Sequence, residues 1–168
     1  TSSIYIEIDN NFKVNAFGFT SPSIYINGAT ESVTTSGSNN YGDTSLVDNK
    51  WYHITITSST AVTTESIFYF LGGHEGLIDD VRFYNVALTA SQANNLYGQK
   101  STVNVPYNSS LIGKWLLNGD FKDFSGYNND AVLSGNAKFI TGYDGNLAFK
   151  SNANNSTIEI NNVYSDLK

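Results

Sequence analysis

The chain has 168 residues, no Cys, no Met and a formal net charge of −6, and only 14% of its residues are charged. Without cysteine it has no disulfide, so a packed core must stabilise it. Its 9 Lys and Arg residues are scattered singly, which argues against nucleic-acid binding. No apolar run is long enough to predict a membrane-spanning helix. A chain without Met is expected to be a processed product or a fragment of a longer protein.

Short runs of strand-forming residues fill the first half of the chain. They cover residues 3–8, 12–17, 23–26, 51–57 and 66–71. The first two runs predict a hairpin, and Asn27-Gly28 is a strong turn signal after the third. Residues 34–45, which are rich in Ser, Gly and Asn, are expected to form a surface loop.

One short helix is expected near residues 90–97. Thr89 and Gln92 are spaced as a capping box at its start. Gly98 stands where a helix C-terminus commonly needs a left-handed residue. This is the single helical segment that the sequence predicts.

The strand before this helix carries two acidic residues and one arginine. Its apolar residues are expected to face the core: Ile78, Val81 and Phe83. That spacing requires a bulge near Asp79 to keep the alternation. Asp80 and Arg82 then share the opposite face and are expected to form a partly buried ion pair. A ligand or metal role for Asp79 is the alternative.

The second half of the chain repeats the pattern of short strands. After an extended connector with Pro106, strands are predicted at residues 111–117, 131–133, 137–140, 147–149 and 157–160. About a dozen short strands with a single helix predict an all-β fold, an antiparallel β-sandwich.

Two blocks of the chain resemble laminin-G-like domains, which have a concanavalin A-like jelly-roll fold. Residues 76–98 resemble the closing segment of that family, and residues 111–160 resemble its opening segment. Residues 50–56 resemble a further strand of the family. One strand that the family has between its opening and closing segments is missing from both ends of this chain. The resemblance implies a jelly roll of the lectin type.

The family's closing segment therefore precedes its opening segment here. We divide the chain into the C-terminal part of a laminin-G-like module (residues 1–98), a connector (99–110) and the N-terminal part of such a module (111–168). Three arrangements fit this order. The chain spans the junction of two tandem modules, or it is a permuted sandwich closed within one chain, or neighbouring chains complete each other's sheets. The last arrangement would build a filament unless it closed into a ring.

Calcium is the metal that the sequence favours. The loop of residues 123–130 offers carboxylate and amide oxygens from Asp123, Asn128 and Asp130, and Ca²⁺ prefers oxygen ligands on flexible loops. Many laminin-G-like domains bind calcium through such loops, so the resemblance supports this site. The alternative is that Asp123 and Asn128 cap the turn through Asx hydrogen bonds.

Tyrosines in polar loops are the candidate ligand-binding residues. Sugars are bound by flat aromatic faces beside planar polar groups. Tyr41, Tyr127 and Tyr143 are surrounded by Asn, Asp and Gly, so we expect them to contact a glycan. The other tyrosines are expected in the core or on the sheet surface.

Catalysis is not expected. The sequence has no nucleophile elbow and no Cys nucleophile, and its Glu residues are dispersed. His74 and Glu75 do not make a zinc site, and His53 is expected to be a satisfied structural histidine.

The resemblance therefore implies a non-catalytic module of a larger extracellular protein, located at a cell or particle surface, that binds a glycan or a surface protein. The alternative is a structural subunit of a filament, surface layer or virion, whose partners are neighbouring copies.

Overall fold

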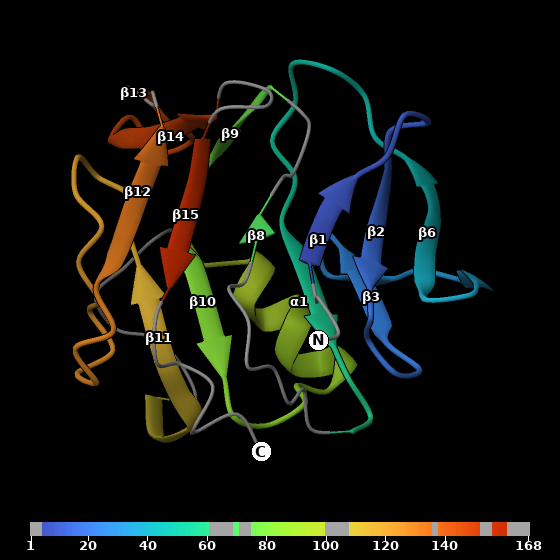
Figure 1. The fold of residues 1–168 in the computed structure, drawn as a ribbon. Coiled ribbons are helices and arrows are strands. Elements are labelled where there is room, and N and C mark those ends of the chain that lie inside the picture. The colour runs from blue at the N-terminus through green and yellow to red at the C-terminus, as the bar shows by residue number, and fades with distance from the viewer. Residues whose placement is uncertain are drawn as a thin grey trace.

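The computed structural model describes residues 5–60, 69–70, 75–99, 108–135, 138–151 and 156–160, and within these ranges the fold is mostly β. Figure 1 shows two groups of strands side by side, with the first sixty residues in one group and the C-terminal strands in the other. The predicted all-β class is confirmed at this level.

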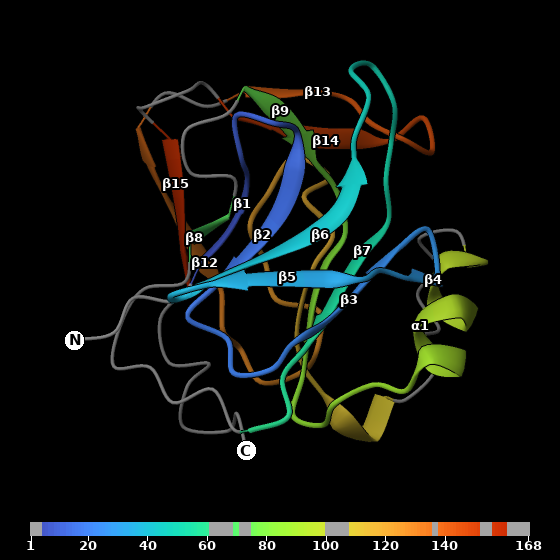
Figure 2. The same ribbon diagram turned by 90° about the vertical axis from the view of Figure 1, so that its right-hand side faces the viewer.

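The N-terminal group contains two sheets. One has the strand order β5-β6-β2-β1-β8, with β1 (Tyr5–Ile8), β2 (Lys13–Phe17), β5 (Val33–Ser36), β6 (Asn39–Ser45) and β8 (Tyr69–Phe70). The other has the order β4-β3-β7, with β3 (Ser23–Ile26), β4 (Ala29–Thr30) and β7 (Ile54–Thr57). Figure 2 shows β5 and β6 toward the viewer and β4 beside α1 (Ala90–Tyr97). The pairs are antiparallel except for β8, which runs parallel to β1.

The C-terminal group contains three small antiparallel sheets. β13 (Lys138–Thr141), β14 (Leu147–Ser151) and β9 (Gly76–Ile78) form one sheet. β10 (Val81–Tyr84) pairs with β11 (Leu111–Trp115), and β12 (Ala131–Gly135) pairs with β15 (Ser156–Ile160). β9 and β10 thus pair with β14 and β11, which lie in the second sequence block, so the two blocks meet within one chain.

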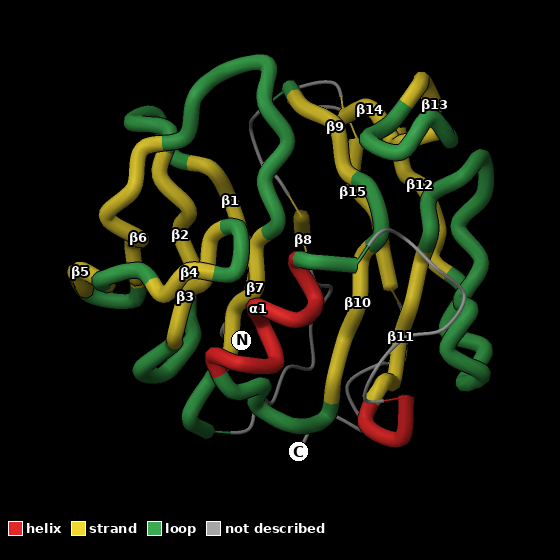
Figure 3. The backbone as a smooth tube through the Cα atoms, turned by 180° about the vertical axis from the view of Figure 1, so that it is seen from behind, coloured by secondary structure: helices red, strands yellow, loops and turns green. Residues whose placement is uncertain are grey.

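The expected helix is present. α1 (Ala90–Tyr97) begins at Thr89, whose side chain accepts the N–H of Gln92 while the Gln92 side chain accepts the N–H of Thr89. Figure 3 shows α1 at the back of the molecule, between the β3–β4–β7 sheet and β10. The prediction for Gly98 was wrong, because its φ is −71°. Its N–H bonds to the oxygen of Asn94, so the chain continues the helical turn without a left-handed residue.

Two strand predictions need correction. Residues 34–45 are not a loop: β5 and β6 form a hairpin around Gly37 and Ser38, with Ser36 paired to Asn39. Gly37 has φ 62°, which suits the first position of such a turn. The expected strand at residues 51–57 begins only at Ile54. Of the dense run at 66–71, only residues 69–70 lie within the described residues.

Two main hydrophobic cores support the two groups. Val14, Ala16, Ile24 and Ile26 are buried in the N-terminal core. The C-terminal core is built around Trp115 and contains also Ile112, Leu117, Ala131, Phe149 and Ile158. A smaller cluster of Leu88, Leu96 and Leu111 lies under α1. Each group is therefore held by apolar burial of its own.

Candidate functional site

The chain changes sheet between β9 and β10. β9 pairs with β14, whereas β10 pairs with β11, and Asp79 and Asp80 form the corner between them. Asp80 has φ 48°, an uncommon conformation for a residue other than glycine. Ile78, Val81 and Phe83 all pack on the C-terminal core. The sequence predicted a bulge near Asp79 within one strand; instead the strand breaks there, and Asp79 and Asp80 link two strands that belong to different sheets.

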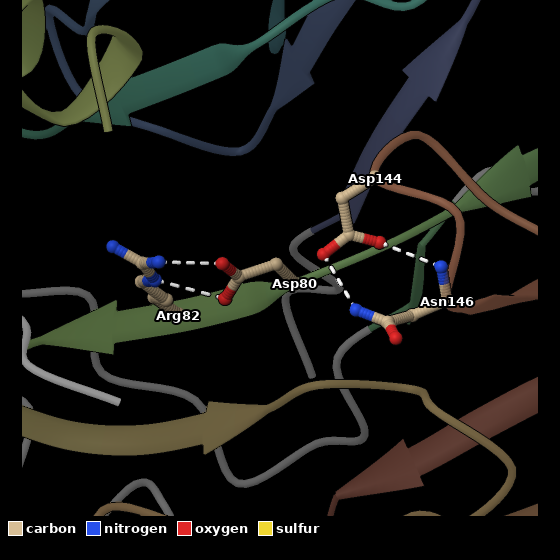
Figure 4. A network of polar contacts seen from close by, with 4 residues as sticks. All are labelled: Asp80, Arg82, Asp144 and Asn146. Carbon is tan, nitrogen blue, oxygen red and sulfur yellow. Dashed lines mark hydrogen bonds and ion pairs between the residues drawn. The ribbon is translucent and has the colours of Figure 1, made fainter. Parts of the chain in front are cut away.

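Asp80 holds Arg82 through two hydrogen bonds. Nε of Arg82 donates to Oδ1 of Asp80 at 2.8 Å, and Nη2 donates to Oδ2 at 2.5 Å, as Figure 4 shows. The side chain of Asp80 is 17% exposed and that of Arg82 is 12% exposed, so the predicted partly buried ion pair is confirmed. Lys114 is directly opposite Arg82 in the register of β10 and β11 and is only 3% exposed. Burial lowers the pKa of Lys114, and the charge of Asp80 partly offsets this.

Asp79 lies under a turn formed by residues 142–146. Its Oδ2 accepts the N–H of Tyr143 at 3.4 Å. A Cβ at Gly142 would be 2.6 Å from this oxygen and 2.8 Å from Cβ of Ala148, so only glycine fits here. Burial raises the pKa of Asp79 to about 6, although the Tyr143 N–H opposes this, and the charges of Asp144 and Asp80 raise it further.

Internal hydrogen bonds fix the turn above Asp79. The N–H of Gly142 donates to the oxygen of Asn146 at 2.7 Å. Asp144 accepts the backbone N–H of Asn146 at 3.0 Å and its side-chain Nδ2 at 2.8 Å, a pair that Figure 4 shows apart from the Asp80–Arg82 pair. The turn therefore presents Tyr143 in a defined place.

An exposed aromatic pair stands at this turn. The ring centroids of Trp51 and Tyr143 are 6.0 Å apart with an interplanar angle of 66°, an edge-to-face contact. Trp51 is 37% exposed and Tyr143 is 64% exposed. We call Trp51, Tyr143, Asp79, Asp144 and Asn146 the aromatic site. It joins the segment before β7, the β9–β10 corner and the β13–β14 turn.

Of the three predicted ligand-binding tyrosines, only Tyr143 belongs to the aromatic site. Tyr41 is partly buried on β6, opposite Asn15 of β2. Tyr127 is half exposed in the loop of residues 123–130. The three lie on separate elements and stay predictions as ligand contacts.

Sequence reasoning missed Trp51 because it was assigned to a strand. Its position after the polar residues 48–50, before the clear alternation begins, was the available signal.

In the predicted calcium loop, carboxylate oxygens of Asp123 and Asp130 accept hydrogen bonds from protein groups. Oδ1 of Asp123 accepts the N–H groups of Lys114 and Ser125, and Oδ2 accepts the hydroxyl of Ser125 and the N–H of Asn129, all at 2.8 to 2.9 Å. Asp130 accepts the N–H of Asp123. Asn128 has φ 59° and so forms the turn itself. This geometry favours the turn-capping alternative, and calcium stays a prediction. In the described ranges, no three His, Asp or Glu side chains gather as a metal site.

His53 differs from the expectation that it is fully satisfied. Its backbone groups bond to Asn27, but its Nδ1 is buried without a hydrogen-bond partner. Burial lowers the pKa of His53, and the charge of Arg82 lowers it further. A neutral imidazole therefore fits this position. His74 of the other histidine motif lies outside the described residues.

Comparisons with known proteins identify no relative. No family model, no curated protein and no solved structure matches the chain. None of the described helices is long and apolar enough to cross a membrane.

Removing the charge of Asp79 is expected to stabilise the protein above pH 6. Its raised pKa means that the folded state holds this proton more tightly than the unfolded state does. Stability from this group is therefore present at low pH and is lost as pH rises from about 4 to about 6. Asp79→Asn should raise the free energy of unfolding at pH 7.5 by about 1 kcal/mol, because solvent screens part of the effect.

Urea unfolding at pH 7.5 and pH 4 measures this difference. The advantage of Asp79→Asn should shrink at the lower pH, and Asp48→Asn at an exposed carboxylate of another turn should show neither effect. A gain that is equal at both pH values would contradict the assignment.

Proposed function

We propose that this chain is a non-catalytic glycan-binding module that binds its ligand at the aromatic site. The observation that carries the proposal is the exposed Trp51–Tyr143 pair, because the turn that carries Tyr143 also carries Asp144 and Asn146 and is bonded to Asp79 through the Tyr143 N–H. Aromatic rings give apolar contact area at low entropic cost, and fixed polar groups orient the hydroxyl groups of a sugar. Both kinds of group occur together at this surface.

The proposal includes the fold class. We infer a concanavalin A-like jelly roll of the laminin-G type, with an extracellular or particle-surface location. The antiparallel pairing of β10 with β11 and of β9 with β14 supports closure of the two sequence blocks within one chain. Fold alone does not fix function, so the aromatic site and not the resemblance carries the functional proposal.

Truncating either aromatic residue should weaken glycan binding by about tenfold or more. Each ring supplies about 1–2 kcal/mol of contact energy, and 1.4 kcal/mol is tenfold in affinity. The full chain is screened against an array of neutral, acidic and amino glycans, and hits are measured by calorimetry. The variants are Trp51→Ala and Tyr143→Ala.

Tyr127→Ala is the matched control, because Tyr127 is also an exposed loop tyrosine. It should leave affinity unchanged. If Tyr127→Ala weakened binding and Trp51→Ala did not, the site would lie at the 123–130 loop. The absence of any glycan hit would contradict the proposed function.

The structural-subunit alternative stays a prediction with its own measurement. Assembly by sheet completion requires neighbouring chains to supply strands, whereas β9 and β10 already pair within this chain. Light scattering over a range of concentrations separates the two. Growth of the mass with concentration would favour the structural subunit, and a constant mass near 18.3 kDa would contradict it.

A further inference from the structure

Two carboxylates, those of Asp79 and Asp144, belong to the aromatic site. An ion pair joins Arg82 to Asp80. Nε and Nη2 of Arg82 both donate to the carboxylate of Asp80. The guanidinium group therefore points at Asp80 and not at Asp144. Burial raises the pKa of Asp79, and the negative charges of Asp144 and Asp80 raise it further. A ligand that reaches this surface meets two carboxylates that a cation would neutralise.

The two rings favour the same kind of ligand. The face of an aromatic ring carries partial negative charge, and an ammonium group within about 6 Å of a ring centroid is attracted to it. Trp51 and Tyr143 meet at 66° and both are exposed, so their faces point in different directions around one corner. An ammonium group bound beside this pair would be attracted to the exposed face of either ring.

We propose that the aromatic site binds an ammonium group carried by an amino sugar of the glycan, between Trp51, Tyr143 and the carboxylates of Asp79 and Asp144. This inference rests on the proposed glycan-binding function and specifies the class of sugar. Uronic acids and other anionic sugars are repelled by the carboxylates. Neutral sugars can stack on the aromatic rings but do not neutralise the carboxylates of Asp79 and Asp144.

A pair of trisaccharides that differ in charge tests the proposal. One is a trimer of glucosamine whose amino groups are trimethylated, so that it stays cationic at every pH. The other is the N-acetylglucosamine trimer, which is neutral and has the same backbone. Calorimetry with the full chain at pH 7.5 should show the cationic trimer binding about five- to tenfold more tightly, as one exposed cation–π contact and one exposed charge pair together predict.

Isosteric variants assign the preference to the carboxylates. Asp79→Asn and Asp144→Asn should each lower the ratio of cationic-trimer to neutral-trimer affinity about threefold, because the amide keeps a hydrogen-bonding oxygen but loses the charge. Asp120→Asn, at an exposed carboxylate of another turn, should change neither affinity. Added salt should reduce the preference for the cationic trimer and not the binding of the neutral one.

Failure of this inference is distinguishable from failure of the proposed function. Equal binding of both trimers, lost on Trp51→Ala, would overturn the ammonium site and leave glycan binding intact. Tighter binding of the cationic trimer that persists in Trp51→Ala and Asp144→Asn would also overturn the ammonium site. Non-specific attraction of a cation to an acidic protein would then explain the preference. Lack of binding by both trimers would overturn the inference, while the glycan array still decides the proposed function.

Discussion

Replacing Asp80 with Asn is expected to lower the free energy of unfolding by about 3 kcal/mol. Arg82 and Lys114 face each other across β10 and β11, and both are largely buried. The carboxylate of Asp80 accepts two hydrogen bonds from Arg82 and lowers the cost of burying both cations. Removing one partner of a buried pair leaves the remaining charges uncompensated, which costs far more than loss of an exposed pair.

Asparagine isolates the charge from the backbone geometry. It matches the size of Asp80, and Asn is one of the residues that tolerate a φ of 48°. Urea unfolding gives the free energy, and Asp48→Asn at an exposed carboxylate is the control. The double variant Asp80→Asn/Arg82→Leu should lose less unfolding free energy than the two single variants lose together, because it removes both charges of the pair. A loss under 0.5 kcal/mol for Asp80→Asn would contradict a buried role.

Local patterns predicted the parts of the fold that depend on neighbouring residues. The capping box at Thr89 and Gln92 needs only a spacing of three residues, and it is present. The ion pair of Asp80 and Arg82 followed from two positions on one strand face, once the core-facing residues were assigned. The hairpin at Gly37 was missed because its polar composition suggested a loop, although Gly-Ser between two strands is a turn signal.

Long-range pairing lies beyond such patterns. The aromatic site forms because a turn at residues 142–146 covers Asp79 and brings Tyr143 to Trp51. Nothing near Trp51 in the sequence indicates that partner, which is more than ninety residues away. The sequence therefore predicted Tyr143 by its polar surroundings but not the residue that completes the pair. Asp123 shows the opposite case, since its four hydrogen-bond donors come mainly from its own turn.

A methyl group at Gly113 should destabilise the protein by about 3 kcal/mol or prevent folding. The Cβ of Gly113→Ala would lie 2.3 Å from Cη2 and 2.7 Å from Cζ3 of Trp115, because the indole ring folds back over the glycine. Trp115 is only 1% exposed and its Nε1 donates to the oxygen of Asn129 at 2.9 Å. The ring of Phe83 packs edge-to-face against the indole of Trp115, with the ring centroids 5.5 Å apart. The indole therefore has no room to move aside.

Gly98→Ala provides the matched control for this effect. Gly98 has φ −71°, and its nearest new contact would be an ordinary 3.7 Å, so alanine should be neutral or slightly stabilising there. The double variant Gly113→Ala/Trp115→Leu removes the clashing ring and should lose less stability than the two single changes added together. Thermal and urea unfolding are measured for the unchanged protein, Gly113→Ala, Trp115→Leu, the double variant and Gly98→Ala. If Gly113→Ala unfolds like Gly98→Ala, the indole does not lie over Gly113 in solution, and the packing of the C-terminal core around Trp115 would have to be revised.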